Sequence, residues 1–163
     1  MTALTEILAG ARLTAAMLRA VAPLAVIKGA DESVTSATLQ NDDALFLPLL
    51  ANASYIWVLV PFYTATASTG DMQAGPVVPS GATVEWTVMH YGSSGTFFID
   101  AGTSSGAVNL FTGAGATVRS AFLAGTVVNS STAGNLQFQW ARNGGTGTTT
   151  VKAGSLIAAW QIS

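Results

Sequence analysis

Hydrophobic positions near the start of the chain recur with the spacing of a helix. Residues 4–22, LTEILAGARLTAAMLRAVA, place apolar side chains on one face at intervals of three and four residues. Thr2 or Thr5 is suited to cap the start, Pro23 marks the end, and Gly10 weakens the middle. The apolar face comprises Leu4, Ile7, Leu8, Ala11, Ala15, Leu18 and Ala22, widened by Leu13 and Met17. The pattern predicts a short amphipathic helix, which either packs on its own domain or forms an arm that attaches to a partner.

After Lys28 the hydrophobic period changes from helical to two, which is typical of strands. Gly, Ser, Thr, Asn and Asp turns separate about eight or nine alternating segments, and no helical pattern follows residue 22. The predicted strand segments lie within 31–49, 54–66, 82–91, 96–102, 107–113, 117–129, 135–143, 148–154 and 155–162. Many short strands at such spacing predict an all-β fold, a β-sandwich of two sheets with a jelly-roll-like topology.

The last strands raise the question of what covers their second face. In a sandwich the inner face would take Leu136, Phe138, Trp140, Leu156 and Trp160. The outer face would then carry Gln137, Gln139, Ala141, Ile157, Ala159 and Gln161, a small, neutral and partly apolar set. Because glutamine amides both donate and accept hydrogen bonds, identical residues can satisfy one another about a symmetry axis. We therefore expect Gln137, Gln139, Ile157 and Gln161 to contribute to self-association, with a homotrimer as the expected assembly.

Composition supports burial of this surface. Charged residues make up 9% of the 163 residues, against a usual share of about 25%, and apolar residues make up 50%. A surface so poor in charge is better suited to contact between subunits than to a freely soluble monomer. The net charge of −2 gives no electrostatic footprint of a nucleic-acid-binding protein, so no nucleic-acid partner is expected.

Residues 44–70 carry no charge and approach the length of a membrane span. Pro48, Asn52 and Pro61 interrupt this run, and β-branched and aromatic residues fill the stretch between them. Buried strands are therefore expected here rather than a membrane span. The N-terminus also lacks the basic residues that begin a signal peptide.

Residue types that perform chemistry are few. The absence of cysteine excludes disulfides, thiolate metal sites and cysteine catalysis. The single histidine, His90, alternates in phase with Trp86 and Val88, which predicts a strand-end structural role. Gly102–Gly106 matches G-x-S-x-G, but a strand pattern follows where a nucleophile elbow needs a helix. No enzymatic activity and no cofactor are therefore expected.

Two further possibilities concern ligands. The acidic pairs Asp31–Glu32 and Asp42–Asp43 consist of oxygen donors that hard cations prefer, but their spacing fits no known loop, and no metal site is expected. Aromatic residues could stack on a sugar, and the candidates are Tyr55, Tyr63, Trp86 and Tyr91. Burial in the core is expected for most tryptophans, because all four lie on strand patterns.

Several blocks of the sequence resemble a domain recurrent in virion proteins of actinobacterial tailed phages. They are ARLTAAMLRAVAPL, ADESVTSATLQNDDAL, PSGATVEW and, most specifically, GTVVNSSTAGNLQFQWARN with the terminal GSLIAAWQI. The resemblance extends from about Ala11 to Ile162. It implies a bacteriophage structural component, found among head decoration proteins and minor tail or fibre-like proteins, with no catalytic residue to transfer.

Together these observations predict a helical arm over residues 1–28 and a sandwich domain over 29–163. The expected function is non-enzymatic: a trimeric capsid decoration protein whose arm reaches the major capsid protein or another virion protein. A minor tail or fibre-like protein and a module that binds host surface glycans remain alternatives. The residues expected to attach the arm are Leu4, Ile7, Leu8, Leu13, Met17 and Leu18.

Overall fold

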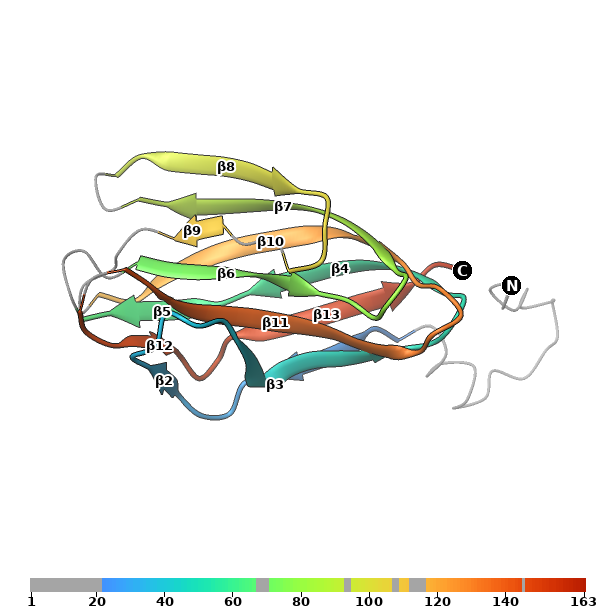
Figure 1. Cartoon of the computed structure of the whole chain (residues 1–163), viewed down its shortest axis with the longest axis horizontal. Helices are drawn as coiled ribbons and strands as arrows, with labels where there is room; N and C mark the ends of the chain where they lie inside the picture. Colours follow the sequence, from blue (N-terminus) through green and yellow to red (C-terminus); the bar gives the residue numbers. More distant parts are fainter. Residues whose placement is uncertain (1–21, 67–70, 93–94, 107–108, 112–116, 145) are drawn as a thin grey trace, which may run out of the picture.

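A computed structural model describes residues 22–66, 71–92, 95–106, 109–111, 117–144 and 146–163. The predicted N-terminal helix and its six attachment residues lie outside these residues. The described chain is all-β, and its strands run along the long axis of the body in Figure 1. Their bounds are β1 Leu24–Ile27, β2 Glu32–Val34, β3 Gln40–Leu49, β4 Ser54–Val60, β5 Phe62–Ala65, β6 Asp71–Val77, β7 Thr83–Tyr91, β8 Phe97–Gly102, β9 Asn109–Phe111, β10 Arg119–Val128, β11 Gly134–Asn143, β12 Thr149–Val151 and β13 Leu156–Gln161.

Two antiparallel sheets form a sandwich. The large sheet has the order β8–β7–β10–β4–β13–β1, and β5, β12 and β2 extend it from β10. The small sheet has the order β3–β11–β6–β9. The chain changes sheet repeatedly, for example between β3 and β4, between β5 and β6, and between β10 and β11, which is the winding of a jelly roll. The predicted fold class is confirmed.

Pro61 divides one long apolar run into two strands. Proline cannot donate a ladder hydrogen bond, so β4 ends at Val60 and β5 begins at Phe62. The Pro61 carbonyl still accepts from the Ala121 N–H at 3.2 Å. β4 pairs with β13, whereas β5 pairs with β12. The uncharged run is thus mostly strand structure as far as Thr66, where its described part ends, and within the described segments no helix is long and apolar enough to cross a membrane.

The core lies between the sheets and takes alternate residues from both. Tyr55, Trp57 and Leu59 of β4 face Leu136, Phe138 and Trp140 of β11, and all six are at most 1% exposed. This alternation follows from the two-residue period of a strand. The predicted inward orientation of the β11 residues is therefore confirmed.

The sandwich begins earlier than the sequence predicted. β1 pairs with β13 in the large sheet, with Leu24 opposite Ala159 and Ile27 opposite Leu156. Lys28, at the end of β1, is 3% exposed. The expected boundary between residues 28 and 29 is therefore wrong, because Leu24–Ile27 form an edge strand of the domain itself and Lys28 is buried in it.

Candidate functional site

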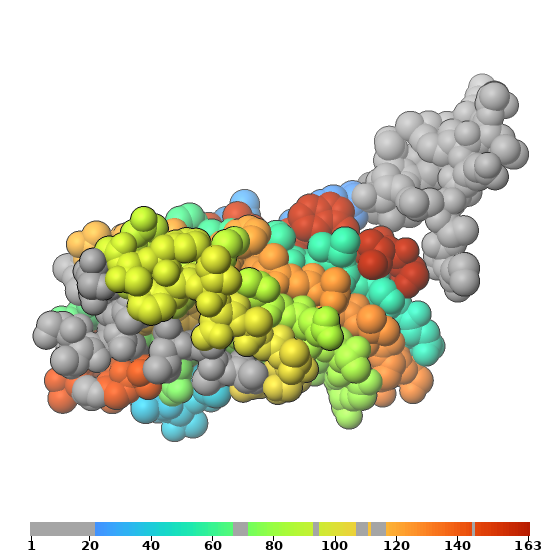
Figure 2. All heavy atoms as spheres, turned by 90° about the horizontal axis from the view of Figure 1, so that it is seen from above, coloured from blue at the N-terminus to red at the C-terminus, as the bar shows by residue number. Residues whose placement is uncertain are grey.

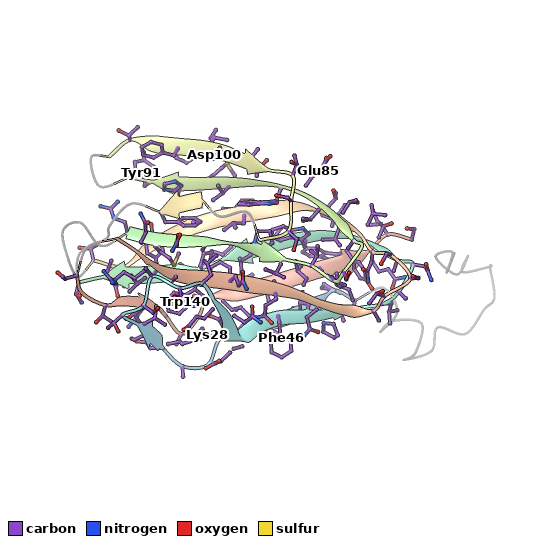
Figure 3. All side chains as sticks on the ribbon, in the orientation of Figure 1. Lys28, Phe46, Glu85, Tyr91, Asp100 and Trp140 are labelled. Atoms are coloured by element: carbon purple, nitrogen blue, oxygen red, sulfur yellow. The ribbon has the colours of Figure 1, made fainter. Side chains whose placement is uncertain are left out.

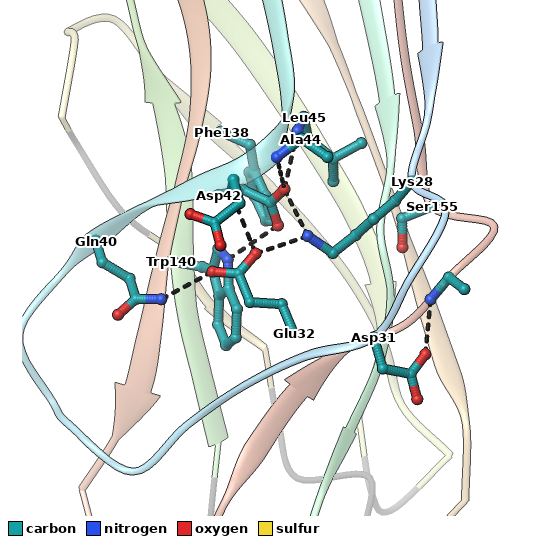
Figure 4. Close-up of polar contacts among 12 residues, drawn as sticks. Lys28, Asp31, Glu32, Gln40, Asp42, Ala44, Leu45, Phe138, Trp140 and Ser155 are labelled. Carbon is teal, nitrogen blue, oxygen red and sulfur yellow. Dashed lines mark hydrogen bonds and ion pairs between the residues drawn. The ribbon is translucent and has the colours of Figure 1, made fainter.

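Three charged side chains from three strands meet inside the described fold. Lys28 follows β1, Glu32 begins β2, and Asp42 lies in β3. The Lys28 amine lies 2.8 Å from Asp42 Oδ1 and 2.6 Å from Glu32 Oε2, and the Asp42 side chain is 0% exposed. Figure 4 shows the three side chains converging beside Trp140. This group is named the Lys28 cluster below.

A four-residue bulge in β3 positions Asp42. Gln139 of β11 pairs with Asn41 and Gln137 pairs with Phe46, so residues 42–45 oppose a single residue of β11. Asp42 Oδ1 accepts the N–H groups of Ala44 and Leu45 at 3.0 and 2.9 Å, which closes the bulge. These bonds satisfy backbone donors that the interrupted ladder would otherwise leave unpaired.

The remaining polar atoms of the cluster also have partners. Trp140 Nε1 donates to Asp42 Oδ2 at 3.1 Å, and Gln40 Nε2 donates to Glu32 Oε1 at 2.9 Å. The Asp43 N–H donates to Glu32 Oε2 at 3.2 Å. The cluster thus joins β1, β2 and β3 to β11, and it holds the edges of the two sheets together.

The protonation of Lys28 decides what this cluster can do. Burial disfavours the ammonium, but hydrogen bonds to Asp42 and Glu32 and their negative charges outweigh burial and raise the pKa of Lys28 above its ordinary value. An amine next to a carboxyl group could in principle form an amide with loss of water. Such a step needs the neutral amine, whereas the structure places Lys28 as an ion-pair partner of both carboxylates.

The other acidic candidate, Asp31, has a separate lysine partner. Its carboxylate is ion-paired with Lys152 and accepts the Ala153 N–H at 2.8 Å. These contacts, first of all the hydrogen bond from Lys152, lower the pKa of Asp31. The acidic pairs are thus arranged around two lysines, and the described residues contain no group of three or more His, Asp or Glu placed to hold a metal ion.

Two of the four residues expected on an outward self-association face lie inside the domain. Gln137 is 9% exposed, and its amide donates to the Asp42 carbonyl at 2.8 Å within the β3 bulge. Ile157 is 1% exposed in the core. The prediction that Gln137 and Ile157 are available on an outward face is therefore wrong, because Gln137 is buried at the β3 bulge and Ile157 faces the core. Gln139 is half-buried and donates to Asn41 at 3.1 Å, and Gln161 is exposed. A role of any of these residues in self-association stays a prediction.

The error at Ile157 comes from the phase of β13. Ile157 pairs with Leu59 and Ala159 pairs with Trp57, both core residues, so the odd-numbered residues of β13 face inward. Leu156 is half-buried, and Trp160, predicted to lie in the core, is 40% exposed. Both faces of LIAAWQ are apolar, so alternation alone does not determine which face is buried.

The predicted chemical motifs occupy ordinary structural positions. His90 is buried between Phe98 and Phe111, with ring centroids 5.2 Å from each. Ser104 is exposed in the turn after β8, and Ser105 accepts the Val78 N–H at 3.0 Å. Of the sugar-stacking candidates, Tyr55, Tyr63 and Trp86 are buried, whereas Tyr91 is 54% exposed.

Sequence reasoning missed the outer face of the large sheet. This face carries Ile56, Ile99, Phe122 and Trp160, which are between 38% and 66% exposed. A usable signal was present, because Val118, Phe122, Ala124 and Val128 align on one side of their strand. The alternation does not tell whether this side of the strand meets the core or solvent. In the structure Val118, Phe122 and Val128 are exposed.

The fold and surface define a jelly-roll sandwich with a buried ion-pair cluster and an apolar outer sheet face. No protein-family model matches the chain, and no curated protein sequence matches it. Among solved structures, Eiger TNF from S. frugiperda is similar over 86% of this chain and 93% of its own, at 9% identity and a TM-score of 0.42.

Structures of infectious bursal disease virus are also similar. The Gx strain structure matches over 87% of this chain and 37% of its own, at 13% identity and a TM-score of 0.20. The VP2 subviral particle matches over 88% of this chain and 37% of its own, at 12% identity and a TM-score of 0.23. The chain thus spans well under half the length of these viral proteins. At such identities and TM-scores, the similarities say nothing about what this chain binds or assembles with.

Proposed function

We propose that this chain is a non-enzymatic structural protein of a bacteriophage particle, a capsid decoration protein that assembles as a trimer and attaches through its N-terminal segment. The resemblance of several sequence blocks to actinobacterial phage virion proteins supports the phage assignment. A minor tail or fibre-like position is the alternative within the same class. The function consists of stabilising contacts, since many identical weak contacts add up over a lattice.

The observation that carries this proposal is the exposed apolar surface. Fourteen large hydrophobic side chains of the described residues are at least 38% exposed, in a chain of which only 9% of residues are charged. Scattered apolar side chains are normal on a monomer, whereas a continuous apolar face indicates a contact with another molecule. An assembly component covers such a face permanently.

The charged groups of the described residues support a structural role. Lys28, Glu32 and Asp42 bind one another, and Asp31 binds Lys152. His90 is packed between two aromatic rings. Among these described groups, each polar side chain is engaged in holding strands together.

The direct test is to locate the protein in the particle. Mass spectrometry of purified virions is expected to detect the chain, and a density map is expected to show it in many copies on the outer shell. Detection in a few copies at the tail would instead support the minor tail alternative. Absence of the chain from purified particles would overturn the proposal.

Attachment through the N-terminal segment is tested in the full chain. Ile7→Asp with Leu18→Asp places charge on the predicted apolar face, whereas Thr5→Asp adds charge without removing an apolar side chain. The double variant is expected to lose binding to heads that lack the protein, and Thr5→Asp is expected to retain it. Equal binding by both would contradict attachment through this segment.

One observation favours a second candidate, the binding of host surface glycans. Tyr91 and Phe97 are 54% and 50% exposed, and their ring centroids are 5.7 Å apart. Exposed aromatic rings are surfaces on which a sugar can stack. A glycan array with the purified protein tests this role, and binding that is lost in Tyr91→Ala would favour it over a purely structural one.

A further inference from the structure

The strand register of the large sheet arranges its outer side chains in parallel rows. One row crosses the sheet through Ile27 and Leu156, which pair, Val60, which pairs with Leu156, and Phe122, Met89 and Ile99, which pair in succession. Every side chain in this row is large and apolar. It is named the large row below.

The adjacent row consists mainly of small residues. Ala25 pairs with Ala158, Ala158 with Val58, and Val58 with Ala124. The row continues through Thr87 to Ala101. It is named the small row, and it lies two residues along each strand from the large row, a distance of about 6.6 Å.

Beyond the small row, large side chains return on the strands nearer β1. Trp160 pairs with Ile56, and the two are 40% and 46% exposed. On β10 and β7 the same line continues with Thr126 opposite Glu85. A shallow hollow of about 390 Å³ opens at this side, lined in part by Thr87, Ala101 and Ala124 of the small row. On β10, β7 and β8 the small row thus opens into a hollow, and on β13 and β4 it lies between two ridges of larger side chains.

Charge is almost absent from this face. Among the outward-facing residues in the paired parts of β1, β13, β4, β10, β7 and β8, Glu85 alone is charged. Figure 3 places Glu85 and Tyr91 on β7 and Asp100 on β8, where the pairing of Asp100 with the core residue Val88 assigns Asp100 to the other face of the sheet. About 25% of the residues of an average protein are charged, so most protein surfaces carry many charged groups. If such a protein bound here, its charged groups would find almost no opposite charges on this face.

We propose that the outer face of the large sheet is the contact between copies of this chain. A second copy offers the same uncharged surface, and its large row fits the small row of the first, so the face is complementary to itself and joins two copies about a two-fold axis. Such a contact gives a dimer, whereas the proposed function has a trimer, so the inference takes from that proposal only that the protein self-associates. This inference rests on the proposed function, in which the protein self-associates, and it identifies the surface. This surface replaces the glutamine face of β11 as the expected site of self-association. On that face Gln137 is already bonded to the β3 bulge of its own chain.

The size of the face is adequate for a contact between subunits. Six strands about 4.8 Å apart span about 24 Å, and six paired residues at about 3.3 Å each span about 20 Å. The resulting flat footprint of about 500 Å², increased by the relief of the side chains, is of the order of the ~800 Å² that each partner contributes to a standard interface. The edge strand β8, which pairs only with β7, borders this face and is seen from its open side in Figure 2.

Two phenylalanines give a matched test. Phe122 lies in the large row, whereas Phe46 pairs with Gln137 on the outer face of the small sheet. Both are 38% exposed, so replacement by glutamate has a similar effect on the isolated domain. Sedimentation equilibrium of the full chain is expected to show an oligomer that Phe122→Glu weakens at least about 30-fold, as at an interface hot spot, while Phe46→Glu leaves it unchanged.

Each outcome is decisive. Ile56→Glu, on the opposite ridge, provides a second variant if Phe122→Glu does not fold, as judged by circular dichroism. An oligomer that resists both variants, or that Phe46→Glu dissociates, would overturn the assignment of the surface. A monomeric wild type would overturn it too, and association gained on deleting residues 1–21 would show that this segment covers the face. Detection of the chain in virions does not depend on these results, so the proposed function can fail or stand separately.

Discussion

Replacing Lys28 by methionine tests whether the Lys28 cluster holds the domain together. The substitution keeps a long, flexible side chain but removes the ammonium that lies 2.8 Å from Asp42 and 2.6 Å from Glu32. Two carboxylates then remain close together, one of them fully buried. Removing one member of a buried ion pair leaves uncompensated charge and destabilises by about 3–5 kcal/mol. For a domain of this size, that loss corresponds to a fall in Tm of about 6–20 °C.

The chain offers a matched control at its surface. Lys152 is ion-paired with Asp31, and their side chains are 32% and 44% exposed. Lys152→Met is therefore expected to cost about 0–1 kcal/mol, as for other exposed ion pairs. Both variants would be measured by urea unfolding at pH 7, with protein concentration held constant because self-association affects apparent stability.

The effect of pH separates a charge effect from a packing effect. In Lys28→Met, the two carboxylates repel each other in the folded state, so protonation is more favourable there than in the unfolded chain. A group that binds protons more readily when folded adds stability as the pH falls. The deficit of Lys28→Met relative to wild type is thus expected to shrink between pH 7 and pH 4. A deficit equal to that of Lys152→Met, or one independent of pH, would refute the reasoning.

Wild-type stability should respond at the alkaline end of the pH range. The raised pKa of Lys28 means that its contribution is fully present below the ordinary lysine value of about 10.4. That contribution is lost as the pH rises through the higher folded-state pKa. The sign is opposite for Asp31, whose lowered pKa adds stability that is present above its ordinary value and lost as the pH falls.

Three further predictions follow from single positions. Lys28, Asp42 and Glu32 are expected to be held by ion pairs alone, so the intact mass of the purified protein should show no loss of one water; such a loss, absent from Lys28→Met, would show an amide bond in the cluster. Gly125→Ala is expected to destabilise the fold by more than about 3 kcal/mol, above ordinary overpacking, since the added Cβ would lie 2.1 Å from the Glu85 carbonyl oxygen. Thermal unfolding checks this against Gly29→Ala, whose added Cβ would meet no atom within 4 Å. Ile157→Ala is expected to cost about 2–5 kcal/mol as a core cavity, while Gln161→Ala, which is exposed, should be near neutral, and equal effects in urea unfolding would contradict the phase of β13.

Much of the fold was predictable because strands have a two-residue period. The alternation of Leu136, Phe138 and Trp140 identified their strand and its buried face, since Gln137 and Gln139 between them are polar. Residues 54–66 were predicted as one strand segment, which the structure divides at Pro61 into β4 and β5. These inferences depend on neighbouring residues along the chain, and local sequence contains that information.

The candidate surface was less accessible from sequence, for two physical reasons. Strands with apolar residues on both faces, such as β13 and β10, do not indicate which face meets the core, and only pairing with β4 decides it. The exposure of Trp160 and the burial of Ile157 both result from that pairing. The pairing of β10 and β13 with β4, which is distant in sequence, had to be known before the buried face of either strand could be assigned.

The amino-acid sequence by itself determined an all-β chain, poor in charge and with a predicted N-terminal helix, because composition and hydrophobic period are properties of local sequence. Tertiary structure alone decided that Asp42 closes a bulge and binds Lys28, and that Gln137 fills the space behind it. It also decided that the unburied apolar face belongs to the large sheet. A strand of two apolar faces can bury only one of them in its own core, and the packing of the opposite sheet selects which one remains exposed.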